Sequence, residues 1–151
     1  MTSDFKYGNK EFVSGISEWA KRTEDALLAI GRQSVQDLID EAQTPRDKGG
    51  SMPVLTGFLR ASGRAKVNSI PSGDTRGEKD QIYGSAAKYS DEPTVSLAIA
   101  DWNAGDTIYF GWTAEYALAQ EFKCGFVETA TQNWQQIVRK NETELKKRYK
   151  I

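Results

Sequence analysis

The residues best suited to chemistry in this sequence lie in the stretch PVLTGFLRAS, residues 53–62. A Thr-Gly pair stands next to an arginine and a serine in this stretch. Backbone amides at such a pair, together with the guanidinium, could bind an anion. The hydroxyl groups could take part in a reaction, or the segment could only turn the chain. The rest of the sequence is needed to decide among these three uses.

Other chemical motifs are missing from the sequence. It contains no GxxxxGK[ST] phosphate loop, no HExxH and no CxxC. It also contains no histidine, so it lacks the commonest general base and the commonest metal ligand, and a Ser-His-Asp triad is impossible. Carboxylate pairs occur at Asp40/Glu41 and Asp91/Glu92, but side chains adjacent in the chain do not converge. We therefore expect no catalytic residue, no bound cofactor and no metal site.

The one cysteine, Cys124, lies beside Lys123, whose charge could activate a thiolate. A small, half-buried side chain is the simpler interpretation of this cysteine. A single cysteine permits no disulfide within the chain, which is typical of proteins that fold in a reducing cytosol.

The composition predicts one soluble globular domain. The chain has 151 residues, of which 27% are charged and 38% hydrophobic. Twenty Lys and Arg residues nearly balance 21 Asp and Glu residues, which argues against a basic protein that coats DNA. The first residues lack the basic flank and apolar run of a secretory signal, and no apolar segment is long enough to span a bilayer.

Helical periodicity is clear near both ends of the chain. Over residues 10–42, apolar residues recur at spacings of three, four and seven or eight. Thr44-Pro45 ends this pattern, because proline disfavours helical geometry in the residue before it. Such a helix would be about 45–50 Å long, more than a domain of this size usually covers. Either it packs along its own sheet, or it bends, or part of it packs on something outside the chain. A second stripe predicts a helix over 126–148.

The middle of the chain has the patterns of strands and loops. Alternation of residue types predicts three strands, the last two of which would pair as a hairpin. The expected elements are, in order, strand 60–70, long loop 71–93, strand 94–100, turn 103–106, strand 107–112 and a short turn or helix at 114–122.

These elements predict the fold class α+β. We expect an antiparallel sheet of three to four strands packed against a long N-terminal helix and a C-terminal helix. The chain would form a single domain over residues 1–151, with a flexible N-terminus at 1–9. Trp19 and Trp134 lie on the helical stripes, where core packing would explain them. Trp102 and Trp112 lie at strand ends and are freer to anchor an interface.

Two stretches of the sequence resemble one family. MPVLTGFLRAS, from Met52 to Ser62, resembles the P-V-[DL]-T-G-x-L-R-x-S signature of the phage tail-completion and neck proteins, which join heads to tails in long-tailed bacteriophages. The second family signature, Y-A-x-x-x-E-[FY]-G, appears from Tyr116 to Phe122. Lys123 stands where that family has glycine, and Gly125 follows. The order of the expected elements is also that of the family, so the resemblance covers about residues 10–148.

The resemblance implies a structural protein of the virion, not an enzyme. In this family, subunits form a ring, typically a hexamer, between the head connector or head-closure protein and the tail tube or tail-terminator protein. DNA passes through the lumen without sequence-specific binding, and the ring assembles in the bacterial cytoplasm. The loop 71–93 would become ordered on docking. Two alternatives stay open: a tail-terminator ring that caps the tail tube, and a small metal-dependent hydrolase or nuclease.

The motif residues then have structural uses. Gly57 gives the backbone freedom at a corner, Thr56 caps the following turn, and Leu59 enters the core. Arg60 would pair with Glu121, within the subunit or across a subunit interface. With Tyr116 from the second motif and the two tryptophans at strand ends, these residues make up the expected interface or structural motif.

Overall fold

The computed structural model describes residues 2–54, 57–73 and 94–151, with the side chains of 2–9 and 94 left aside. Within these ranges the chain is rich in helix and has one two-stranded sheet, an α+β arrangement. The elements, in chain order, are α1 (Thr2–Ala42), the 3₁₀ helix η1 (Arg46–Lys48), α2 (Phe58–Ala61), β1 (Gly63–Val67), α3 (Thr94–Asp101), β2 (Ile108–Trp112), α4 (Ala117–Cys124), α5 (Phe126–Gln132) and α6 (Trp134–Tyr149).

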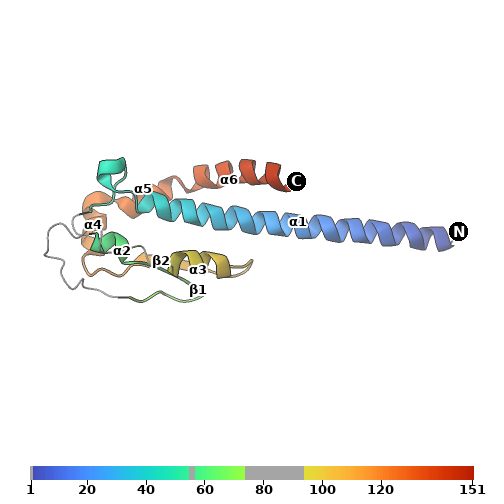
Figure 1. The fold of residues 1–151 in the computed structure, drawn as a ribbon, viewed down its shortest axis with the longest axis horizontal. Helices are drawn as coiled ribbons and strands as arrows, with labels where there is room; N and C mark the ends of the chain where they lie inside the picture. The colour runs from blue at the N-terminus through green and yellow to red at the C-terminus, as the bar shows by residue number, and fades with distance from the viewer. Residues whose placement is uncertain (1, 55–56, 74–93) are drawn as a thin grey trace.

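Helix α1 is the axis of the molecule. Figure 1 shows α6 along one side of it and β1, β2 and α3 along the opposite side. The helix ends at Ala42, where the sequence predicts its end, but it begins at Thr2, well before residue 10. Its N-terminal half extends beyond the other described elements (Figure 1). Only the C-terminal half of α1 therefore packs on its own chain, and packing of the other half on something outside the chain stays a prediction.

The sheet consists of β1 and β2, paired antiparallel from Gly63 opposite Trp112 to Val67 opposite Ile108. Backbone bonds extend the ladder at both ends, with the Thr113 amide donating to the Ser62 carbonyl at 3.1 Å and the Asn68 amide donating to the Thr107 carbonyl at 2.7 Å. The strand expected at 60–70 is shorter than predicted because α2 occupies its first residues.

The strand expected at 94–100 is wrong, since these residues form helix α3. Val95, Ala98 and Ile99 recur at spacings of three and four, so they also fit one face of a helix. Ala98 and Ile99 are buried, whereas Leu97, which a strand would have placed on the same face as Ile99, is 61% exposed. The predicted hairpin therefore does not form. The described residues contain two strands, not the three to four that we expected.

Helix α6 runs back along α1 and buries part of its surface. The Asn141 side chain, 2% exposed, donates to Ser34 Oγ at 3.3 Å and to Asp37 Oδ2 at 2.9 Å. Ala26 and Ile30 of α1 and Leu145 of α6 are also buried. The amide has partners on α1, so its burial does not leave its N–H donors unsatisfied, which would be costly. The single helix expected at 126–148 is broken into α5 and α6 at Asn133.

The main apolar cluster joins α2 and α5 to the chain segments that follow η1 and β2. It consists of Met52, Phe58, Leu59, Ala114 and Phe126, all buried. The Trp112 ring packs edge-on against Phe126 and Phe110, with centroid distances of 4.9 and 4.7 Å. Such edge-to-face pairs are favourable for aromatic rings.

Gly31, in the middle of α1, is explained by a close contact. A Cβ atom at this position would lie 2.5 Å from Cζ3 of Trp102, so only glycine lets the indole of Trp102 lie directly on the helix. The cost of glycine in a helix, about 1 kcal/mol against alanine, is thus offset by packing of α1 on the α3–β2 connection.

Candidate functional site

The corner made by the first motif is structural. Gly57 has φ 84°, in the left-handed region that glycine adopts easily, and it stands at the N-terminus of α2. Its carbonyl accepts a bond from the Ala61 amide at 2.9 Å. The backbone freedom expected of Gly57 is therefore used. Leu59 is 3% exposed and enters the core as expected, although from α2 and not from a strand. Thr56, expected as a cap, lies outside the described residues.

Ser62, the last residue of the first motif, joins this corner to the chain after β2. Its buried hydroxyl donates to the Leu59 carbonyl at 2.7 Å and accepts from the Ala114 amide at 3.2 Å. Sequence reasoning assigned no role to Ser62 beyond its place in the motif. The sequence shows Ser62 only as one polar residue in an alternating pattern, and such a pattern does not indicate that the serine bonds to Ala114, 52 residues away in the chain.

The second motif caps a helix. The Glu121 carboxylate accepts bonds from the Val127 amide at 2.8 Å and the Glu128 amide at 3.0 Å, two donors of the first turn of α5 that have no partner within that helix. A negative charge at this end also suits the helix dipole. Gly125, with φ 60°, makes the turn that brings the amides back to Glu121. The turn after Glu121 is therefore made by Gly125, two residues after Lys123.

Glu121 thus has partners different from the one expected. The Glu121 carboxylate accepts from the amides of α5, and the described residues show no ion pair between Glu121 and Arg60. Arg60 lies on α2, half-buried, beside a polar hollow of about 170 Å³ whose lining includes Asp40 and Gln43. The pairing of Arg60 with Glu121 across a subunit interface stays a prediction.

Tyr116 connects the two motifs. It is half-buried at the N-terminus of α4, and its ring lies 6.4 Å, centroid to centroid, from that of Phe58 in the first motif. The two stretches on which the family resemblance rests are therefore in contact around one core.

The tryptophans are distributed in the reverse of the expected way. Trp19 and Trp134, expected in the core, are 59% and 38% exposed. Trp102 and Trp112, expected to be free for an interface, are half-buried and packed within the chain.

The two packed tryptophans differ in their polar contacts. Trp102 donates its Nε1 proton to the Asp106 carbonyl at 2.8 Å, and its own carbonyl accepts two bonds from Arg32 at 3.2 and 2.8 Å. The Nε1 atom of Trp112 is buried, and no acceptor for it lies within reach among the described residues. An interface role for either tryptophan stays a prediction.

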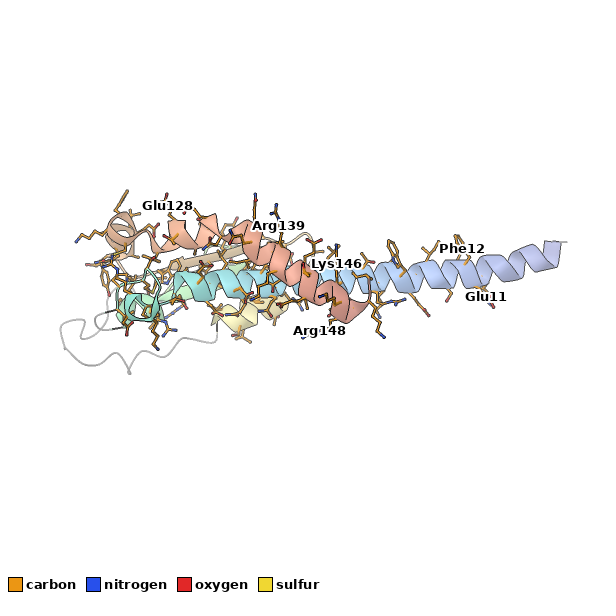
Figure 2. All side chains as sticks on the ribbon, turned by 90° about the horizontal axis from the view of Figure 1, so that it is seen from above. Glu11, Phe12, Glu128, Arg139, Lys146 and Arg148 are labelled. Atoms are coloured by element: carbon orange, nitrogen blue, oxygen red, sulfur yellow. The ribbon has the colours of Figure 1, made fainter. Side chains whose placement is uncertain are left out.

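Two of the apolar surfaces left open among the described residues matter for assembly. The first is a stripe on the N-terminal half of α1, which we call the α1 stripe: Phe12, Val13, Ile16 and Trp19, between 49% and 67% exposed. Arg148 lies near the C-terminal end of α6, and Figure 2 shows Phe12 on the part of α1 that extends beyond it. The second is a hollow of about 250 Å³ that we call the α1–β2 hollow. Its lining residues are Val35, Leu38, Ile39, Ala42, Ile108, Phe110, Trp112, Val127, Ala130, Thr131 and Trp134.

Neither surface has the groups of a reaction centre. Among the described residues no group of three or more His, Cys, Asp or Glu side chains could hold a metal ion. The Lys146 ammonium, 2.6 Å from the carboxylate of Glu142, lowers the pKa of Glu142 by its hydrogen bond and charge, but this pair lies on the exposed side of α6. No helix in the described part of the chain is both long and apolar enough to cross a membrane.

Comparisons with known proteins found no match: no family model fits this chain, no curated protein is similar to it, and no solved structure matches it.

Proposed function

We propose that this chain is a structural subunit of the head–tail interface of a tailed phage, a tail-completion or neck protein. In this proposal several copies, most simply six, form a ring that joins the tail to the head connector. DNA passes through the lumen of the ring without sequence-specific binding. The chain does no chemistry, and its partners are its own copies, a connector or head-closure protein on one side and a tail protein on the other.

The observation that carries this proposal is the uncovered half of α1. Apolar side chains that are half to two-thirds exposed, aligned on a helix beyond the rest of the chain, favour burial against a neighbour. A helix in a protein gains most of its stability when its apolar face packs on another element, so the projecting half of α1 would be stabilised by a partner. A subunit of a larger assembly has such a neighbour, and a small enzyme does not need one.

The contacts of the two sequence motifs support the same proposal. Gly57, Leu59 and Ser62 turn and anchor the chain, and Glu121 caps α5. All four residues make their contacts inside the fold, so these motif residues stabilise the structure of the subunit. This use agrees with an assembly protein whose function depends on shape.

A test of the proposal is the loss of the gene from the phage that encodes this chain. We expect DNA-filled heads and tails of normal length to accumulate separately, and purified chain to join them when it is added to the mixture. Electron microscopy of the particles gives the readout. Joined, infectious particles in the absence of the chain would overturn the proposal, and so would tails of abnormal length, which point to a tail terminator.

A further inference from the structure

The α1 stripe and the α1–β2 hollow are complementary in shape and chemistry. The stripe projects from a rod and contains two large aromatic side chains, Phe12 and Trp19. The hollow is concave, and its volume of about 250 Å³ is many times the roughly 30 Å³ that a water molecule occupies in the liquid, so it has room for an aromatic side chain. Aromatic anchors in apolar pockets are the usual hot spots of protein interfaces.

Charge does not oppose contact between these two surfaces. None of the residues that make up the stripe or line the hollow is charged. Charged neighbours of the stripe, such as Glu18 and Lys21, are exposed on other faces of α1, where they stay solvated. Docking would therefore bury apolar surface without the cost of burying an unpaired charge.

A chain cannot fill its own hollow with its own stripe. Both lie on α1, a helix with a rise of about 1.5 Å per residue, so Trp19 and Val35 are held roughly 24 Å apart. Helix α6 does not cover the stripe either, because α6 ends at Tyr149 and Phe12 lies well beyond it (Figure 2). The occupant of the hollow, if it is the stripe, must come from a second copy of the chain.

We propose that the α1 stripe of one copy docks in the α1–β2 hollow of the next, with Trp19 as the anchor. This inference rests on the proposed function and names the contact by which the ring forms. Because the stripe and the hollow are different surfaces, each copy can use one toward each of two neighbours, and such a heterologous contact gives a ring when it closes, whereas two copies that exchanged stripes reciprocally would stop at a dimer. Contact between two stripes would instead end at two copies and leave both hollows uncovered.

A cysteine pair tests this contact directly. Ala20 is exposed at the edge of the stripe and Thr131 is exposed at the rim of the hollow, so cysteines at both positions leave the anchor residues in place. The variant carries Ala20→Cys and Thr131→Cys in a Cys124→Ser background. It is mildly oxidised in two samples, the purified protein and the joined particles. We expect a ladder of covalent oligomers longer than the dimer. Each single-cysteine chain should give no covalent oligomer.

The other outcomes overturn the contact. Covalent dimers from Ala20→Cys alone would mean that stripes meet stripes. Joined particles without any ladder would refute this contact and leave the proposed function in place. A ladder in purified protein that never joins heads to tails would refute the function and leave the contact in place.

A matched pair of variants measures the anchor. Trp19→Ala should weaken association of the subunits at least about tenfold, as removal of an interface hot spot does. Lys21→Ala, on the same helix but off the stripe, should change it less than about twofold. Trp19 is 59% exposed in the single chain and Lys21 is also exposed, so both variants should fold. Sedimentation measures the association of both variants. If the two associate equally strongly, Trp19 is not the anchor of the contact.

Discussion

The two halves of α1 have the same apolar periodicity but different surroundings. In the C-terminal half, Ala26, Ile30 and Ile39 are at most 8% exposed, because α3, α5 and α6 pack against this part of α1. In the N-terminal half, Phe12 and Ile16 are 67% and 49% exposed. The comparison teaches that a helical stripe predicts a helix and its apolar face, but does not predict which element covers that face.

The largest expected difference between the halves comes from removing the same side chain in each. Ile30→Ala should lower the free energy of unfolding by about 2–5 kcal/mol, because it leaves a cavity in packed surroundings. Ile16→Ala should change it by about 0.5 kcal/mol or less, as exposed substitutions do. Chemical denaturation of dilute protein, where the single chain predominates, measures both. Similar losses at the two positions would mean that the N-terminal half is covered within the chain.

The polar contact in the covered half should be the next most sensitive point. Asn141→Ala removes both bonds to α1 and should cost about 1–3 kcal/mol, since Ser34 and Asp37 would lose a buried donor. Ser14, on the uncovered half of the same helix, is exposed, and Ser14→Ala should be near neutral. If thermal unfolding of the Asn141→Ala chain matches that of the native chain, α6 is not anchored to α1 as described.

Two glycines of α1, Gly15 and Gly31, should change the stability of the fold in opposite directions. Gly31→Ala forces a methyl group into the Trp102 ring, at a cost of about 1–3 kcal/mol that helix propensity offsets by up to about 1 kcal/mol. Gly15→Ala meets no described atom within 4 Å and should stabilise the helix by up to about 1 kcal/mol. The melting temperatures of the two variants give the comparison. A gain in both would show that Trp102 does not lie on α1.

Part of this fold follows from local rules in the sequence. The end of α1 at Ala42 was predicted because Thr44-Pro45 acts within one turn of it. The strand at 107–112 was predicted at nearly its true bounds. The helix at 94–101 was missed because a short apolar segment fits both a period of two and a period of 3.6 residues. Contacts of this segment with the sheet and with α1 decide that it is a helix and not a strand.

The candidate site follows the same division. The roles of Gly57 and Leu59 were predicted because they depend on their own backbone and hydrophobicity. The partners of Glu121 and the surroundings of the four tryptophans could not be predicted, because they depend on where α5 and α6 begin and end. Trp19 and Trp134 fit a helical stripe as well as any core residue, and whether such a stripe is buried is a property of the whole fold.

The smallest expected effect concerns an ion pair on the solvent-accessible surface of α6. The hydrogen bond and charge of Lys146 hold the pKa of Glu142 below its ordinary value of 4.5 in the folded chain. A carboxyl whose pKa is lowered by folding stabilises the fold above its unfolded pKa, and this stabilisation is lost as the pH falls through the folded value. Glu142→Gln should therefore slightly lower the melting temperature at about pH 7 and leave it unchanged at about pH 2. Added salt should reduce the difference at neutral pH, because the pair is exposed. A loss of the same size at both pH values would mean that the Glu142 side chain acts through packing, and that this surface of α6 is covered.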